Sequence, residues 1–392
     1  MSKKIYLYND KTCTRVKLYG IDAFHLFKAN GYKVADSFEA ADLIIINTCS
    51  FLKSKEDYFL NFIKEVNGKI KKRQKILIIG CLPNINSEDI SNINSDIIML
   101  GRDLDLIKKH FNFTKDISTR ATSVTDKLNA KKQIIYLLNK YILRSKHIEY
   151  RLKRDKVCYL QISSGCMGKC TYCSERFTTK LKSRTIEDIK IAILDGYAKG
   201  YRLFGLNSDD ASAYGRDIHT SLEKLLTEIV SIDKDVSFSI PEFNPNGLSD
   251  KVIDSLKDSK FLYITVPIQS GSQSILDLME RPYNIDEILR RIKYIKENNK
   301  KLKINTHIIV GFPGETAEDF QKTKNILKMG LFDRVKVFMY NERPNTKAIH
   351  FEGKVSEEEK LSRRNELIKI VKRENFKHFS LTNLILNKEQ LK

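Results

Sequence analysis

The sequence predicts an α/β protein with two consecutive units, a doubly wound parallel sheet followed by an open, partial βα barrel. Three observations support this fold class. Short apolar, β-rich runs alternate with helical patterns over the first 115 residues, the strand-then-helix alternation resumes at residue 157, and cysteines follow several of the predicted strands. Continuous apolar strands are typical of parallel sheets that helices cover on both faces.

The first unit, residues 1–118, contains the apolar runs 5–8, 43–46, 76–79 and 97–100, which we interpret as strands. Amphipathic helices are predicted between them, at 15–30 and 55–72. Strands and helices in this alternation form a doubly wound sheet.

Residues 119–156 are predicted to be a basic helical connector. Apolar residues from Ile134 to Ile142 recur at helical spacing, and lysines and arginines occupy the remaining positions. We expect one packed stripe and a charged face in water. The alternative is that this basic face contacts the substrate.

The second unit, residues 157–345, has predicted strands at 157–162, 201–206, 236–240, 261–266, 302–310 and 334–338. Helices are expected at 185–199, 217–230, 249–258, 284–297 and 316–329. Six βα units form a partial (β/α)6 barrel, whose active site belongs at the carboxyl ends of the strands. The last segment, 346–392, is predicted to be a tail that begins with a charged helix at 357–374.

Composition narrows the class of protein. The chain has 392 residues, of which 41% are hydrophobic and 30% charged, with a formal net charge of +20. Such an excess of positive charge favours an anionic macromolecule as partner. The alternative is that the surplus lysines reflect only the lysine-rich composition of the sequence. No apolar run reaches the roughly 18 residues of a membrane span, and the first residues do not form a signal peptide, so we expect a cytoplasmic protein without a membrane partner.

One cysteine motif follows the first barrel strand. Cys166, Cys170 and Cys173 have CxxxCxxC spacing, with Tyr172 before the last of them. Three thiolates can bind three irons of a 4Fe–4S cluster and leave the fourth iron open to a substrate. The alternative is a structural zinc site, for which Cys158 would be the fourth ligand; Cys158 is more simply a buried apolar residue.

Three further cysteines each follow a predicted strand of the first unit. Cys13, Cys49 and Cys81 all lie just beyond such strand ends. Parallel sheets build their sites at this edge, so these thiols are expected to converge. Three scattered buried cysteines are the alternative, but equivalent positions favour a second three-thiolate cluster.

The cysteine loop at 163–173 resembles that of the radical S-adenosylmethionine (SAM) superfamily. Together with further motifs, the chain resembles its methylthiotransferase family, which carries two iron–sulfur clusters, over nearly its whole length. These motifs are Asn47-Thr48-Cys49, Gly80-Cys81, the Gln-Ser-Gly-Ser stretch at 267–272 followed by Met279-Glu280-Arg281, the Gly-Phe-Pro-Gly-Glu stretch at 308–316, and the segment 340–348.

Three departures from the family pattern concern the substrate. The run 177–184 is shortened and lacks the usual Arg-Gly pair, and Ser208-Asp209-Asp210 replaces a Gly-Gln-Asp or Gly-Gln-Asn segment. The residues after 345 are too few for the small carboxy-terminal β-barrel (TRAM) of the family, which we therefore expect to be missing.

The resemblance implies two 4Fe–4S clusters, on Cys13, Cys49 and Cys81 and on Cys166, Cys170 and Cys173, and SAM as cofactor. It implies that one electron, from a donor of the flavodoxin or ferredoxin type, cleaves SAM to a 5′-deoxyadenosyl radical that activates a C–H bond for methylthio transfer. Tyr172 is expected to contact the adenine of SAM and Asp209 its amino group. Arg343 either contacts the substrate or pairs with a carboxylate.

The expected function is methylthio transfer to a peptide or protein side chain, such as that of a ribosomally synthesised precursor peptide, because the TRAM barrel is expected to be absent. The alternative is 2-methylthio transfer to transfer RNA (tRNA) adenosine, which the net charge and the basic connector favour. Met167-Gly168, between the first two cysteines of the loop, also resembles the archaeal and eukaryotic tRNA-modifying branch of the family. Two other classes are a non-catalytic iron–sulfur or RNA-binding relative, and a cobalamin-dependent methylase, whose Asp-x-His-x-x-Gly motif the chain lacks.

Overall fold

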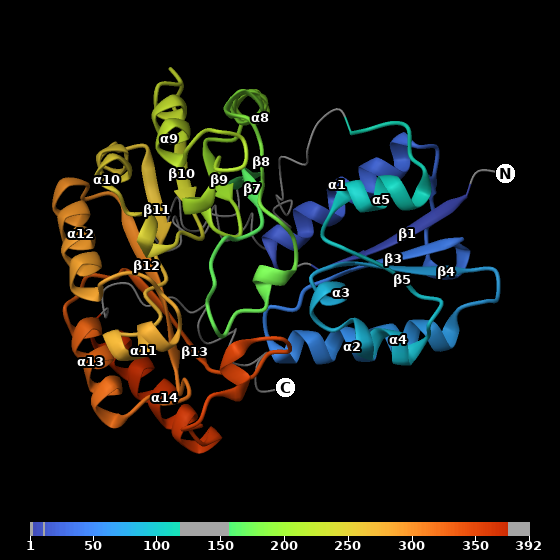
Figure 1. The fold of residues 1–392 in the computed structure, drawn as a ribbon. Helices are drawn as coiled ribbons and strands as arrows, with labels where there is room; N and C mark the ends of the chain where they lie inside the picture. Colours follow the sequence, from blue (N-terminus) through green and yellow to red (C-terminus); the bar gives the residue numbers. More distant parts are fainter. Residues whose placement is uncertain (1–2, 11, 118–156, 375–392) are drawn as a thin grey trace, which may run out of the picture.

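The computed structural model describes residues 3–10, 12–117 and 157–374. Within these ranges the chain forms two α/β bodies that lie side by side, the first in blue and the second from green to red in Figure 1. Each body has its own parallel sheet. The predicted connector, 119–156, and the tail beyond residue 374 lie outside the described residues.

The first sheet has five parallel strands in the order β2-β1-β3-β4-β5. They are β1 (Lys4–Asn9), β2 (Lys33–Val34), β3 (Leu43–Thr48), β4 (Lys75–Gly80) and β5 (Ile98–Gly101). The predicted doubly wound sheet is confirmed, and its order changes direction between β1 and β3. Ligands of such sheets bind at that point, outside the carboxyl ends of the strands.

Helices cover both faces of this sheet, as Figure 1 shows. One face packs on α1 (Thr14–Ala29) and α5 (Leu104–Phe111). The other packs on α2 (Lys53–Lys69), α3 (Leu82–Ile85) and α4 (Ser87–Ile93). Alternate residues of β3 belong to opposite cores, Ile45 to the first and Ile44 to the second, which is why the whole strand is apolar.

The second sheet has six parallel strands that neighbour one another in chain order. They are β6 (Val157–Gln161), β9 (Leu203–Asn207), β10 (Ser237–Ile240), β11 (Phe261–Thr265), β12 (Lys303–Val310) and β13 (Arg334–Met339). Because β6 and β13 are the two edges, the barrel stays open, which confirms the predicted partial (β/α)6 barrel. A short antiparallel pair, β7 (Ser163–Ser164) and β8 (Lys182–Ser183), flanks the cysteine loop.

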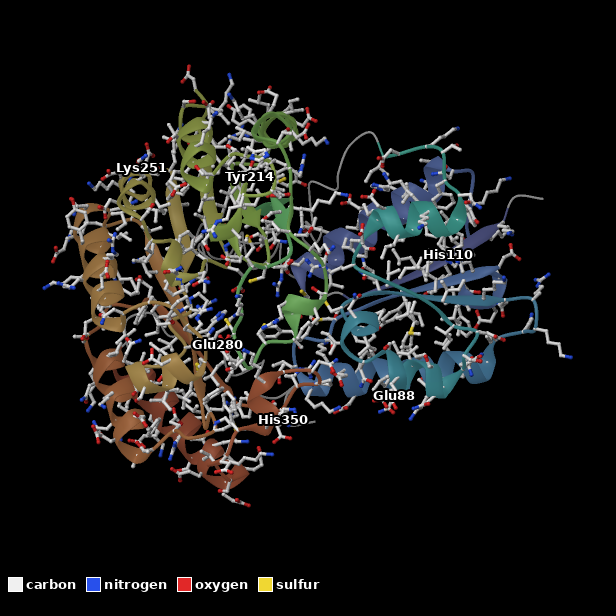
Figure 2. The ribbon with its side chains drawn as sticks, viewed as in Figure 1. Glu88, His110, Tyr214, Lys251, Glu280 and His350 are labelled. Atoms are coloured by element: carbon white, nitrogen blue, oxygen red, sulfur yellow. The ribbon has the colours of Figure 1, made fainter. Side chains whose placement is uncertain are left out.

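The helices of the second body pack against the outside of this sheet, and Figure 2 shows side chains filling the space between them. They are α8 (Ile186–Ala198), α9 (Leu222–Val230), α10 (Asp250–Leu256), α11 (Gln273–Leu278), α12 (Ile285–Asn298) and α13 (Ala317–Lys328). The helix α14 (Glu357–Glu374) lies where the sequence predicts it and packs on α13 and β13. In the described parts of the chain, no helix is long and apolar enough to cross a membrane.

Candidate metal centre

The three cysteines of the first body converge at the carboxyl edge of its sheet. Cys13 follows β1, Cys49 directly follows β3, and Cys81 directly follows β4. The Cys49 thiol is hydrogen-bonded to Cys13, and Cys81 is close enough to act on the charge of both. We call these three residues the first triplet. They lie around the β1–β3 position, where this strand order builds ligand sites.

A hydrogen bond and nearby charges favour the thiolate form of one cysteine of the first triplet, Cys13. The hydrogen bond from Cys49 lowers the pKa of Cys13 to about 5, with help from Arg15 and Arg102 and against the effect of burial. The pKa of Cys49 is raised by that same hydrogen bond and by burial, and burial raises the pKa of Cys81. Metal binding to all three would therefore release protons from the two thiols.

A glycine brings Cys81 into the first triplet. Gly80 has φ +97°, and a Cβ at this position would lie 2.2 Å from the carbonyl oxygen of Thr48. The Cys81 N–H donates to that same oxygen over 2.9 Å. The β4 end thus approaches β3 more closely than a side chain would allow, next to Cys49.

The second triplet, Cys166, Cys170 and Cys173, lies in the loop between β7 and β8. Each of Cys166 and Cys173 has its pKa raised by burial and by the neighbouring cysteines, that of Cys173 to about 12. The Gly168 N–H donates to Cys166 Sγ over 3.3 Å, and Arg281 Nη1 lies 3.3 Å from Cys170 Sγ. The motif at 279–281 therefore places the Arg281 guanidinium against a cysteine of the loop.

The structure does not support the zinc alternative with Cys158 as a ligand. Cys158 is buried in the barrel core, and its Sγ lies against Gly196 of α8. Among the described residues, no three His, Cys, Asp or Glu side chains have the arrangement of a single-ion site. A 4Fe–4S cluster binds each thiolate through a different iron, so its ligands lie further apart than those of one ion.

Tyr172 and Asp209, the predicted SAM contacts, both lie close to the second triplet. The Tyr172 ring packs edge-on against Phe312, with 6.3 Å between centroids, and burial beside Cys170 raises its pKa. Asp209 follows β9 and accepts the Gly165 N–H, next to Cys166, over 2.6 Å. Whether either side chain binds SAM stays a prediction.

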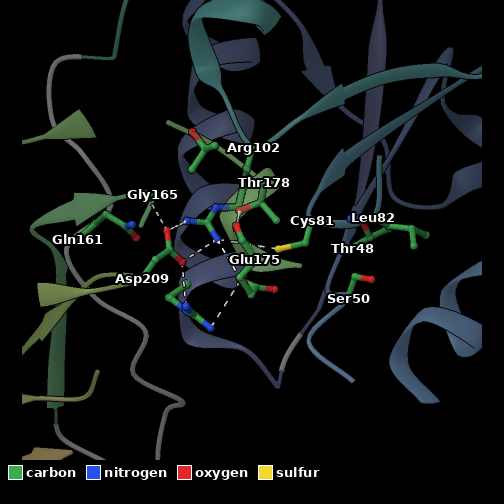
Figure 3. A network of polar contacts seen from close by, with 12 residues as sticks. Thr48, Ser50, Cys81, Leu82, Arg102, Gln161, Gly165, Glu175, Thr178 and Asp209 are labelled. Atoms are coloured by element: carbon green, nitrogen blue, oxygen red, sulfur yellow. Dashed lines mark hydrogen bonds and ion pairs between the residues drawn. The ribbon is translucent and has the colours of Figure 1, made fainter. Parts of the chain in front are cut away.

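Two arginines of the first body donate hydrogen bonds to the Asp209 carboxylate. Arg15 Nη1 and Arg102 Nη1 donate to Oδ1 over 2.8 and 3.0 Å, and Arg102 Nη2 donates to Oδ2. Figure 3 shows this network together with Glu175 and Cys81. Burial alone would raise the pKa of Asp209, but the arginines hold it at about 2. A carboxylate has about four acceptor positions, all of them engaged here, so an amino group at Asp209 would have to displace a donor.

Several buried polar atoms at the barrel's strand ends have no hydrogen-bond partner. Some of them belong to motifs that the sequence singled out, but no role was predicted for these side chains. Among the described residues they include Gln161 Oε1, Ser163 Oγ, Asn207 Nδ2, Ser208 Oγ, Gln269 Oε1 and Tyr340 Oη. Asp210 Oδ2 also lies 3.9 Å from Cys166 Sγ. Unpaired buried polar groups are costly, so this set fits a polar ligand such as SAM beside the second triplet. For Gln161 and Asn207, the signal in the sequence is their position at strand ends.

Three titratable side chains interact with Arg15, which lies close to Cys13 of the first triplet. Burial raises the pKa of Glu175 and of Glu242, and Arg15 lowers both in part. Arg15 and Arg102 each lie 3.9 Å from Glu175 Oε2. Burial, together with Lys336 and Arg15, lowers the pKa of His307 to about 3.

This barrel and its cysteine loop define the class of protein: an enzyme of the radical SAM superfamily. The model of that superfamily matches residues 160–327, and that of the uncharacterized protein family UPF0004 matches residues 22–101. The chain is 30% identical over 350 residues to a probable threonylcarbamoyladenosine tRNA methylthiotransferase of Pyrococcus horikoshii, covering 88% of this chain and 78% of the relative. It is 30% identical over 338 residues to the ribosomal protein uS12 methylthiotransferase RimO of Pseudothermotoga lettingae, covering 85% and 74%.

The chain therefore belongs to the radical SAM methylthiotransferase family, whose members transfer a sulfur-containing group. Membership of the superfamily implies a 4Fe–4S cluster and SAM. A solved structure of the cobalamin-binding radical SAM methyltransferase TsrM from Kitasatospora setae has a TM-score of 0.62 at 13% identity, covering 89% of this chain and 74% of that chain. That likeness concerns the fold alone.

Proposed function

We propose that this enzyme transfers a methylthio group to an adenosine of tRNA, using two 4Fe–4S clusters. The observation that carries the proposal is the pair of cysteine triplets at the carboxyl ends of two separate sheets, bridged by side chains of both bodies. The first triplet would hold the auxiliary cluster and the second the cluster that binds SAM. The donor of the electron would be a flavodoxin or a ferredoxin.

Charge and kinship support RNA as the substrate. The formal net charge of +20 favours a polyanion. The two relatives are named for tRNA and for a ribosomal protein, and neither is named for a small precursor peptide. We therefore place tRNA before the peptide substrate that the sequence alone favoured.

The chain's own residues would bind and orient the reacting groups. When bound, the SAM-loaded cluster supplies a radical that removes hydrogen from the substrate, and the auxiliary cluster supplies the methylthio group. Arg281 would hold the second triplet through Cys170, and the unpartnered strand-end atoms of Gln161, Asn207 and Gln269 would orient SAM. The packing of the two bodies would exclude water, which would otherwise quench a reactive carbon.

The test is nucleoside mass spectrometry of bulk tRNA from a methylthio-deficient host that expresses this chain. We expect a methylthioadenosine with the intact protein and none with Cys170→Ala, which removes one thiolate of the second triplet. Cys158→Ala is the matched control, because Cys158 lies in the barrel core away from both triplets, and it should keep the product. The absence of product from an intact protein that still cleaves SAM would contradict the RNA substrate.

A protein side chain is the second candidate, because RimO of P. lettingae, named for uS12, is as similar as the tRNA relative. Mass spectrometry of ribosomal proteins from the same cells tests it, with a methylthio mass shift on uS12 as the supporting result. An anaerobic assay for 5′-deoxyadenosine distinguishes an enzyme from a non-catalytic relative. A visible spectrum of the purified protein tests for a bound corrinoid.

A further inference from the structure

Arg343 links the residues that follow one cysteine of each triplet. Its Nη2 donates to the carbonyl oxygen of Ser50 over 2.5 Å and to Ser50 Oγ over 3.0 Å, and Ser50 follows Cys49. Its Nε lies 3.5 Å from Ser174 Oγ, and Ser174 follows Cys173. One buried guanidinium from the loop after β13 therefore joins the residue that follows Cys49 to the residue that follows Cys173.

An ion pair holds Arg343 in this place. Its Nη2 lies 2.8 Å from Glu56 Oε2 of α2, and the Glu56 side chain is fully buried. Ser50 Oγ and Asn86 Nδ2 donate to the same carboxylate. Nearby Arg343 lowers the pKa of Glu56 against the effect of burial, so this carboxylate stays charged and keeps its partner.

Arg102, a residue of the first body, makes a second link between the two triplets. Its Nη1 lies 3.9 Å from Cys81 Sγ, and both of its terminal nitrogens donate to Asp209 of the barrel. Asp209 in turn accepts the Gly165 N–H, next to Cys166. Figure 3 shows the continuous path from Cys81 through Arg102 and Asp209 to Gly165.

We propose that Arg343 and Arg102 are positioning residues that set the separation of the two triplets, and so of the two clusters. The inference rests on the proposed function, because it takes each triplet to hold a cluster. The two bridges touch or adjoin four of the six cysteines, two in each triplet. Two links at different places fix a distance and limit rotation, which one link would not do.

Arginine suits this role for a geometric reason. Its planar fork of five donors reaches several acceptors in fixed directions, whereas lysine presents a single nitrogen on a flexible stem. A transfer between two centres depends steeply on their geometry, and a displacement of about 1 Å can cost roughly 100-fold in rate. A buried ion pair is by itself weak support for a stabilising role. The adjacency to cysteines is what points to positioning.

The test is Arg343→Lys in the full-length, cluster-loaded protein. Lysine keeps the charge beside Glu56, but its donors all lie on one nitrogen, whereas Arg343 uses Nη2 for Ser50 and Nε for Ser174. We expect iron and sulfide contents equal to wild type and SAM cleavage within about twofold of it. Methylthio groups transferred per SAM cleaved should fall by about 10- to 100-fold.

A spectroscopic readout tests the separation without turnover. When both clusters are reduced, their magnetic interaction broadens or splits the electron paramagnetic resonance signal, and it weakens steeply with distance. Arg343→Lys should change this interaction. Arg102→Lys should change it as well, because it alters the other bridge, so the separation can still be tested if one of the two variants fails to fold. The matched control is Arg291→Lys, which alters an arginine ion pair on the barrel helix α12 and should change neither readout.

Unchanged coupling of SAM cleavage to transfer, together with an unchanged resonance signal, would overturn the inference even if the variants melt earlier. Wild-type protein that binds about four irons instead of about eight would overturn the proposed auxiliary cluster, and the inference with it. Two interacting clusters without any tRNA product would count against the proposed substrate alone, because the resonance comparison still measures the separation.

Discussion

At the scale of single residues, the titratable groups that interact with Arg15 include two acids and a histidine. Glu175 and Glu242 have raised pKa values because burial disfavours their charge, and His307 has a lowered pKa for the same reason. His307 also faces Lys336 and Arg15, and its ring packs edge-on against Phe338. The neutral imidazole is therefore the form that the folded protein favours.

His307 should make the protein less stable in mild acid. Its pKa is about 6.5 unfolded and about 3 folded, so between these values the unfolded chain binds more protons and stability falls as pH falls. From pH 7 to pH 5 this group alone removes roughly 2 kcal/mol of unfolding free energy. Urea unfolding of His307→Gln at both pH values should show a smaller loss than wild type. Equal losses would contradict the lowered pKa.

At the scale of elements, the strands could be predicted because a strand that is buried on both faces has a continuous run of apolar residues in the sequence, as in β3 and β4. The cysteines at their ends could be predicted to meet because parallel strands share an edge. β2 was missed because it has two exposed residues, Lys33 and Val34, and no pattern. Pairing of Arg343 with a carboxylate was one of its two predicted roles, but its partner Glu56 could not be named. The ion pair of Arg102 with Asp209 was missed. Contacts between residues more than 100 positions apart depend on how the bodies pack and leave no local signal.

The end of β4 offers a test of how the first triplet is built. Gly80→Ala introduces a Cβ that clashes with the Thr48 backbone at an unfavourable φ. We expect a loss of roughly 3 kcal/mol in stability and about half of the wild-type iron, measured by thermal melting and metal analysis. Gly31→Ala is the control, since Gly31 also has a positive φ, +87°, but a Cβ at this position would meet no atom within 4 Å. This variant should lose roughly 1 kcal/mol of stability and keep the wild-type iron content.

The helix α14 is attached to the barrel through a buried ion pair. Arg363 Nη1 lies 2.7 Å from Glu315 Oε2, and the same nitrogen donates to the Glu315 carbonyl. Arg363→Met should cost roughly 3–5 kcal/mol, because it leaves a buried carboxylate without its partner. Arg363→Met/Glu315→Gln should recover part of that loss in urea unfolding, and full additivity of the two substitutions would count against the pairing.

At the scale of the whole molecule, the surplus of positive charge should govern how an RNA binds. If tRNA is the substrate, its affinity should fall roughly 1,000-fold between 50 and 200 mM salt, as about six phosphate contacts would require. Filter binding with tRNA at several salt concentrations measures the slope. A binding constant that does not change with salt would argue against RNA as the substrate.

The division of the six thiols between two sheets also orders events in time. The first sheet ends at Gly101, whereas the barrel begins at Val157 and Arg343 comes late in the chain. Domains fold as they leave the ribosome, amino end first. We therefore expect the first three thiols to come together before any barrel strand has been made, and labelled iron should enter nascent chains stalled before residue 157. The order of synthesis would then set the order in which the two triplets become available to iron.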